Sequence, residues 1–151
     1  MPRPRGGDWL TDELQSLREM GVDVLVSLLT TEEERELELD QEGSLCVATG
    51  LEYASFPVED RDLPAANVVD FIRTLASQLQ AGRSIAVHCR MGIGRSSLIA
   101  ASVLGLLGTE SDAAFAMIAT ARGMTVPDTP EQRDWVSTFL KRYGPSFPDA
   151  G

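Results

Sequence analysis

The ten residues from position 88 to 97 carry the side chains best suited to chemistry in this chain. They read His88-Cys89-Arg90-Met91-Gly92-Ile93-Gly94-Arg95-Ser96-Ser97. A cysteine thiolate is a nucleophile, and a guanidinium offers a planar pair of donors that matches two phosphate oxygens. A cysteine and an arginine six positions apart therefore predict a phosphate site with a nucleophile at its entrance.

The surrounding pattern predicts how this loop holds an anion. A loop that leads from a strand into a helix turns its N–H groups inward, next to the positive end of the helix dipole. Gly92 and Gly94 permit the tight backbone that such a cradle requires. The same field favours the thiolate of Cys89 at neutral pH, and the Ser96 hydroxyl is placed to donate to the sulfur when it departs. The alternative, an incidental buried cysteine in a glycine-containing turn, does not account for the spacing of Cys89 and Arg95.

The remaining loop residues are predicted to support these two. We expect the stretch between the cysteine and the arginine to bind the phosphate, namely Arg90, Met91, Gly92, Ile93 and Gly94. His88 precedes the cysteine, so its side chain points to the opposite face of the strand. We expect it to hydrogen-bond backbone and shape the loop, with a general-base role as the alternative.

The motif His-Cys-x5-Arg-Ser resembles the active-site loop of the protein-tyrosine phosphatase superfamily, in particular its small dual-specificity branch. The resemblance covers the chain from Gly7 to about Tyr143. It implies hydrolysis of phosphomonoesters through a phosphocysteine intermediate, with Arg95 as the phosphate clamp and with neither a metal nor another cofactor. It also implies that phosphate-like anions bind in the loop.

Phosphate ester cleavage also needs a general acid for the leaving oxygen. The segment Pro57-Val58-Glu59-Asp60-Arg61-Asp62-Leu63-Pro64 lies between a predicted strand and a predicted helix and offers three carboxylates. The residues alone leave the choice open. The resemblance to the Pro-x-x-Asp-x-x-x-Pro acid loop of small dual-specificity phosphatases selects Asp60, followed by Asp62 and then Glu59. Asp62 otherwise caps the next turn.

Three further residues have two interpretations each. Gln132 fits a capping box with Thr129, whereas in relatives a glutamine near this position orients the hydrolytic water. Arg122 either pairs with an acid or contacts a substrate anion. Cys46 either packs in the core or, as in some related phosphatases, forms a disulfide with Cys89 after oxidation.

These residues need a framework of strands and helices. Apolar runs predict strands over 22–29, 51–58 and 84–88. Helical spacing predicts helices over 10–17, 68–79, 98–107 and 114–121, and a short helix over 45–48. A capping box of Thr31 with Glu34 predicts a further short helix. The last predicted helix starts at Pro130 and turns Trp135, Phe139 and Tyr143 inward. The alternation predicts an α/β fold, a short and mainly parallel central sheet flanked by helices on both faces, with ligands at the carboxyl ends of the strands.

Composition limits the class of protein. The 151 residues suit a single domain over 1–151, with a flexible tail from about 145. The phosphatases that the chain resembles usually carry a further strand before the position of Gly6. The net charge is −10, and residues 32–42 hold seven acids and one arginine, expected to form a solvated helix face. This acidity argues against nucleic acid or a membrane as partner. No apolar stretch is long enough to span a membrane. The first residues lack the apolar core of a signal peptide, so we do not expect them to be one.

The expected function is that of a cysteine-dependent tyrosine or dual-specificity protein phosphatase. Two cysteines do not form a disulfide framework and suit a reducing cytoplasm. We expect a monomer that acts on a phosphorylated protein or peptide. The alternatives are a phosphatase for phosphoinositides or other small molecules, a rhodanese-like sulfurtransferase, and a phosphate-binding module without turnover.

Overall fold

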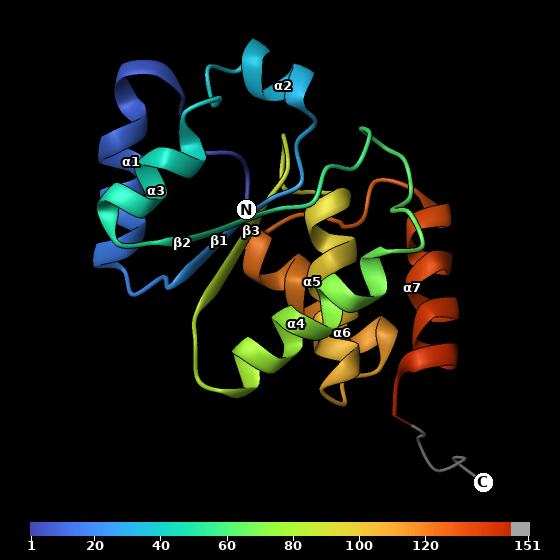
Figure 1. The fold of residues 1–151 in the computed structure, drawn as a ribbon. Helices are drawn as coiled ribbons and strands as arrows, with labels where there is room; N and C mark the ends of the chain where they lie inside the picture. Colours follow the sequence, from blue (N-terminus) through green and yellow to red (C-terminus); the bar gives the residue numbers. More distant parts are fainter. Residues whose placement is uncertain (146–151) are drawn as a thin grey trace, which may run out of the picture.

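A computed structural model describes residues 1–145 of the chain and contains a three-stranded parallel sheet (Figure 1). The strands are β1 (Val24–Ser27), β2 (Glu52–Ser55) and β3 (Ile85–His88), in the order β2-β1-β3. All four residues of β1 are buried, because this strand has a neighbour on each side and helices on both faces. The prediction of a strand covered by helices on both faces is thus confirmed, and so is the α/β fold class.

Helices cover both faces of the sheet (Figure 1). A 3-10 turn, η1 (Gly7–Trp9), leads into α1 (Leu10–Glu19), which packs with α3 (Glu42–Thr49) on one face. The other face carries α4 (Val68–Gln80), α5 (Arg95–Leu106), α6 (Ser111–Arg122) and α7 (Pro130–Tyr143). Side chains of a strand alternate between faces. Leu25 accordingly joins the α1–α3 core, whereas Val24 and Val26 join the core of α4 to α7.

Two helices of the larger layer match the sequence prediction closely. α5 contacts α4, α6 and α7, and it is buried around most of its circumference, as its nearly uniform apolar sequence predicts. α7 starts at Pro130 after the predicted Thr129 cap. Its aromatic residues form a stack in which Phe139 is buried between half-buried Trp135 and Tyr143. The tail expected beyond position 145 lies outside the described residues.

The short helix α2 (Thr31–Glu36) corrects two predictions. Its capping box is made by Thr30 and Glu33, not by Thr31 and Glu34. The Glu33 N–H donates to Thr30 Oγ1 at 3.2 Å, and the Thr30 N–H donates to Glu33 Oε1 at 3.2 Å. Both threonines have a glutamate three positions later, so the motif alone does not fix the register.

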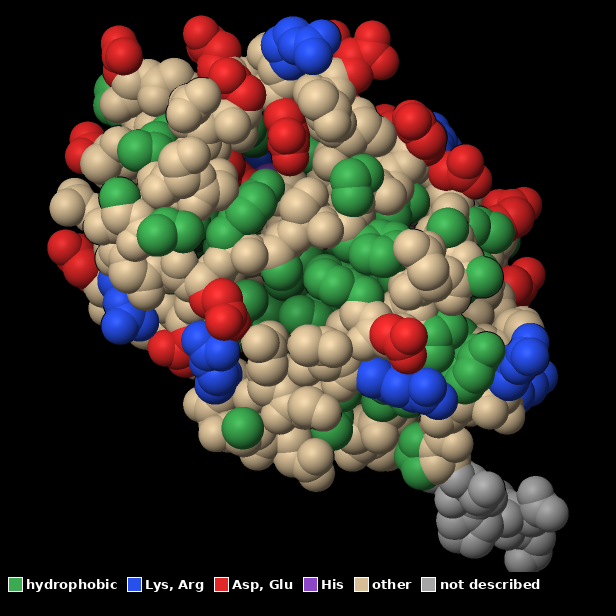
Figure 2. Space-filling model, in the orientation of Figure 1, with side chains coloured by type: hydrophobic (Ala, Val, Ile, Leu, Met, Phe, Trp, Pro, Cys, Tyr) green, Lys and Arg blue, Asp and Glu red, His purple; other side chains and the backbone are tan. Residues whose placement is uncertain are grey.

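The acidic run is also not simply a solvated face, because Glu33 and Glu42 are buried. Each of the two pairs with a buried cation or imidazole, which compensates the cost of removing a carboxylate from water. Most of the other acids of the run are exposed. Figure 2 shows acidic side chains gathered at the end of the molecule that carries α2 and the loop after β2.

The parallel sheet brings three connections to one edge. α2 follows the carboxyl end of β1, residues 56–67 follow β2, and residues 89–94 follow β3. Because parallel strands end at the same edge of a sheet, these three segments meet there. Among residues 1–145, no helix is both long and apolar enough to cross a membrane.

Candidate active site

The segment after β3 curls around the sulfur of Cys89. The Gly92 N–H donates to Cys89 Sγ at 3.3 Å, and Ser96 Oγ lies 3.4 Å from the same sulfur. Within the described residues, the main-chain N–H groups of Met91, Ile93 and Gly94 donate to no other backbone group. The sulfur thus sits at the floor of a loop whose amides precede the N-terminus of α5, a combination that attracts an anion.

The two loop glycines are required for different reasons. Gly92 has a φ of 74°, in the left-handed region that disfavours other residues. Gly94 has an ordinary φ of −91°, so the special backbone expected for both glycines occurs only at Gly92. A β-carbon at Gly94 would lie 2.5 Å from Asp128 Oδ2 and 2.8 Å from Gln132 Nε2. Gly94 therefore allows these two side chains to approach the loop closely.

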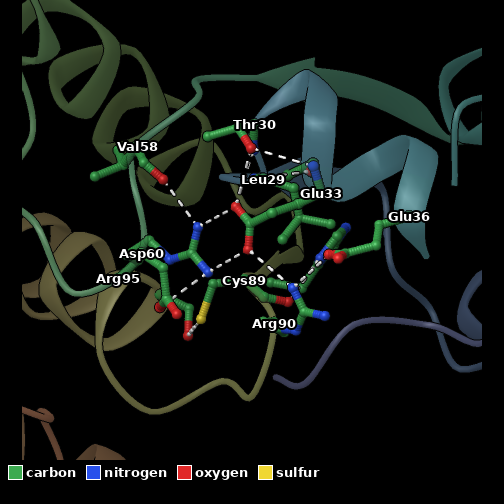
Figure 3. A network of polar contacts seen from close by, with 12 residues as sticks. Leu29, Thr30, Glu33, Glu36, Val58, Asp60, Cys89, Arg90 and Arg95 are labelled. Carbon is green, nitrogen blue, oxygen red and sulfur yellow. Dashed lines mark hydrogen bonds and ion pairs between the residues drawn. The ribbon is translucent and has the colours of Figure 1, made fainter.

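The guanidinium of Arg95 is buried and is held by protein groups on three sides (Figure 3). Nη1 donates to Glu33 Oε1 at 2.6 Å and to the Val58 carbonyl at 2.8 Å, and Nη2 donates to Glu33 Oε2 at 2.9 Å. Asp60 Oδ1 lies 3.3 Å from Nη2. The two-pronged contact with Glu33 fixes the plane of the guanidinium next to the loop.

Both members of this ion pair are charged over a wide pH range. Burial by itself raises the pKa of Glu33, but the hydrogen bonds from Arg95 and Thr30 outweigh it, so this pKa lies below its ordinary value. Burial likewise lowers the pKa of Arg95, but Glu33, followed by the charges of Cys89 and Asp60, more than reverses this effect. The carboxylate thus keeps the guanidinium positive in a buried position.

Sequence reasoning did not identify Glu33 as part of the site. The available signal was the overlap of two Thr-x-x-Glu motifs directly after the first predicted strand. A glutamate at that place starts a helix at the carboxyl edge of the sheet, where ligands bind. The surrounding run of acids concealed it, because such runs are usually solvated.

Of the three carboxylates after β2, Asp60 is the one that approaches Arg95. Its side chain is 59% exposed, at the mouth of the loop. Asp62 is engaged locally, because its Oδ1 accepts the N–H of Leu63 at 2.8 Å. The main-chain carbonyl of Glu59 accepts the N–H of Asp62 at 3.0 Å, which closes the same turn.

The two arginines beside the loop have distinct partners. Arg90 Nη1 donates to Glu36 at 3.1 Å and lies 3.8 Å from Glu33. Arg122 donates from Nε to the Gly92 carbonyl at 3.3 Å and from Nη2 to the Met91 carbonyl at 3.1 Å. Arg122 therefore braces the loop backbone, and it pairs with no acid among residues 1–145. The Met91 side chain is exposed, and that of Ile93 packs against the core.

The two predicted supporting residues, His88 and Gln132, are buried, and so is Cys46. His88 Nδ1 lies 3.2 Å from the Cys89 carbonyl, which agrees with its expected backbone contact. Gln132 forms the predicted capping box, since its Oε1 accepts the Thr129 N–H at 3.2 Å, and its Nε2 has no partner in the described part of the chain. Cys46 packs in the α1–α3 core, where burial, followed by the charge of Glu42, raises its pKa to about 12.

No group of His, Cys, Asp or Glu within residues 1–145 has the arrangement of a metal site. The groups that the described geometry places around the loop of amides are a thiol, a fixed guanidinium and a carboxylate. These are the parts needed to bind a phosphoryl group and transfer it to sulfur.

Comparisons with known proteins agree with this geometry. The family model described as "Tc-R-P: Polymorphic toxin system, DSP-PTPase phosphatase" matches residues 1–109, which include all three strands, Asp60 and the loop from Cys89 to Arg95. A search of curated proteins finds no match.

Solved structures share the fold at low sequence identity. Kinase associated phosphatase with its catalytic cysteine replaced by serine superimposes with a TM-score of 0.82 at 22% identity, over 94% of this chain and 84% of that one. The active form of Tk-PTP gives 0.74 at 22% identity, over 94% and 88%. PTPMT1 in complex with PI(5)P gives 0.71 at 20% identity, over 89% and 85%.

Proposed function

Because the chain belongs to the DSP-PTPase phosphatase family of polymorphic toxin systems, we propose that it hydrolyses phosphomonoesters through a phosphocysteine intermediate. The observation that carries this proposal is the loop after β3, which curls around Cys89 Sγ and ends at Arg95, the first residue of α5. Charge stabilisation by such a preorganised site supplies most of the rate in phosphoryl transfer.

In the first step the Cys89 thiolate attacks phosphorus. A sulfur–phosphorus bond forms while the bond to the leaving oxygen breaks, and protonated Asp60 gives its proton to that oxygen. The loop amides and Arg95 bind the other three phosphoryl oxygens. The position of Asp60 supports this role, because its side chain lies at the mouth of the loop, next to the residue that binds the phosphoryl oxygens.

In the second step water attacks the same phosphorus. Asp60, now a carboxylate, takes the proton of the water while the sulfur–phosphorus bond breaks. Inorganic phosphate and the thiolate result, and the Ser96 hydroxyl, 3.4 Å from the sulfur, donates to the departing thiolate. Gln132 lies beside Gly94. We assign it two roles: it caps α7, and it orients the attacking water.

The proposed substrate is a phosphorylated protein or peptide, with phosphotyrosine first and phosphoserine or phosphothreonine next. Arg90 is the one charged residue between Cys89 and Arg95, and it is engaged by Glu36. The acidic end of the molecule around α2 also opposes a substrate with several phosphates, such as a phosphoinositide. We propose that the chain acts as a monomer in a cytoplasm, where the thiol stays reduced.

The test is hydrolysis of p-nitrophenyl phosphate by the wild type and three variants. We expect Cys89→Ser to abolish turnover and Asp60→Asn to lower kcat by about 10²–10⁴. Asp62→Asn, the matched control, should keep most of the activity because its carboxylate caps a local turn. Near-normal activity of Cys89→Ser overturns the mechanism, and a larger loss in Asp62→Asn moves the acid to that residue.

A panel of substrates then separates the remaining classes. Phosphotyrosine, phosphoserine and phosphothreonine peptides are compared with phosphoinositides, inositol phosphates and the thiosulfate–cyanide pair. Higher kcat/KM on the peptides supports the proposed substrate. Sulfur transfer from thiosulfate instead indicates a sulfurtransferase, and tight phosphopeptide binding without turnover indicates a binding module.

A further inference from the structure

A buried pair of titratable side chains lies directly behind the phosphate loop and has no role in the mechanism above. His88 ends β3 and is fully buried, and Glu42 begins α3 and is 1% exposed. His88 Nε2 lies 2.9 Å from Glu42 Oε1. On the other side of the ring, Nδ1 lies 3.2 Å from the carbonyl oxygen of Cys89.

The partners of the imidazole determine how many protons it carries. A carbonyl oxygen only accepts hydrogen bonds, so Nδ1 must donate to the Cys89 carbonyl. An ionised carboxylate also only accepts, so Nε2 must donate to Glu42 as well. Both nitrogens donate only in the imidazolium form.

The position of Glu42 supplies two groups that can stabilise a negative charge on its carboxylate. It lies in the first turn of α3, where the helix dipole stabilises negative charge. Its second oxygen, Oε2, is buried and has no hydrogen-bond partner within residues 1–145. A buried anion with one unpaired oxygen needs a compensating positive charge, and His88 is in direct contact with it.

We propose that Glu42 is a positioning residue that holds His88 as an imidazolium behind the nucleophile. The pair is neutral as a whole, but its positive member lies nearer to Cys89. The imidazolium then fixes the first carbonyl of the phosphate loop and favours the anionic sulfur. This role rests on the proposed phosphatase function, whereas the protonation of the ring does not.

Other titratable groups surround the pair, and their charges set its environment. Three titratable groups lie close enough to interact electrostatically with Glu42 or with each other: Glu34 of α2, Asp40 of the turn before α3, and Cys46 of α3. The hydroxyl of Tyr53 in β2 donates to Glu34 at 3.5 Å. Burial, followed by the charge of Glu42, raises the pKa of Glu34. His88 is the only group of this cluster that contacts the loop backbone in the described structure.

The chain has a single histidine, so its ring can be observed without ambiguity. In protein labelled with ¹⁵N-histidine, NMR at neutral pH is expected to show two protonated ring nitrogens with slow solvent exchange in the wild type. Glu42→Gln is expected to show one, because the glutamine amide can donate to Nε2 while Nδ1–H keeps its bond to the carbonyl. A wild-type ring with one proton overturns the proposal, and this measurement does not require the variant to fold.

Kinetics test the consequence for the nucleophile. Since Glu42→Gln preserves the hydrogen bonds but removes the charge from the ring, its kcat/KM for p-nitrophenyl phosphate should be about three- to tenfold lower on the acid limb of the pH profile and close to wild type at higher pH. The control is Glu34→Gln, which removes a nearby negative charge without touching His88. General loss of negative charge favours a thiolate, so this control should leave the acid limb in place or move it to lower pH.

The NMR and kinetic measurements distinguish a failure of the His88–Glu42 proposal from a failure of the proposed phosphatase function. An acid limb of Glu42→Gln that moves with the control, or stays at the wild-type position, overturns the role of the imidazolium in favouring the thiolate. A wild-type protein without phosphatase activity but with a doubly protonated ring overturns the proposed function and retains the assignment of the pair.

Discussion

Replacing Glu33 with glutamine removes the negative charge that faces Arg95 while it keeps the local fold of α2. Glutamine is accepted at the third position of a capping box, so the bonds to Thr30 can remain. The two-pronged ion pair with Arg95 at 2.6 and 2.9 Å is lost. The substitution therefore tests the charge on Glu33 separately from the helix cap.

The magnitude follows from what Arg95 retains. Breaking a fully buried ion pair costs about 3–5 kcal/mol. Arg95 keeps the Val58 carbonyl and the nearby carboxylate of Asp60, and the Glu33 side chain is 11% exposed, so we expect a loss of about 1–3 kcal/mol in unfolding free energy. A guanidinium displaced by about 1 Å lowers kcat/KM roughly 10- to 100-fold, or about 1.4–2.7 kcal/mol in transition-state stabilisation.

The assay compares wild type, Glu33→Gln and Glu32→Gln on p-nitrophenyl phosphate, together with urea unfolding of each. Glu32 is exposed on the same helix, so the control variant should match the wild type in both measurements. If Glu33→Gln keeps its kcat/KM within twofold and its unfolding free energy unchanged, the carboxylate does not orient Arg95 and the reasoning fails.

Three further predictions concern pH and the loop. The pKa of Glu33 is lowered in the folded state, so the stability difference between wild type and Glu33→Gln should be complete above pH 4.5, the ordinary value, and should shrink as pH falls further; urea unfolding at several pH values checks this, and a constant difference contradicts it. Gly94→Ala should lower kcat about tenfold or more, because its β-carbon displaces the amide of Gln132 and the carboxylate of Asp128; wild-type turnover would show that both side chains move aside freely. Arg122→Met retains an apolar stem but removes two donors to loop carbonyls, so kcat/KM should fall roughly three- to tenfold; an unchanged value in steady-state assays would mean that the loop needs no such brace.

The sequence determined the features that depend on neighbours along the chain. The curled loop requires a cysteine, two glycines and an arginine within seven positions between one strand and one helix, and all of these lie in a single strand–helix unit. The Thr129–Gln132 capping box is local in the same way and forms as predicted. The buried central strand could be predicted because an uninterrupted apolar run is stable only when both faces are covered.

Tertiary structure decided which distant charges meet the loop. Glu33 contacts Arg95 from 62 positions away, and Glu42 contacts His88 from 46 positions away, yet both belong to an acidic run that resembles a solvated surface. The segment after β2 offers three carboxylates, and packing alone turns Asp60 toward Arg95. Such contacts depend on which connections leave the same edge of the sheet, because a carboxylate is buried only where folding also brings a partner that compensates its lost hydration.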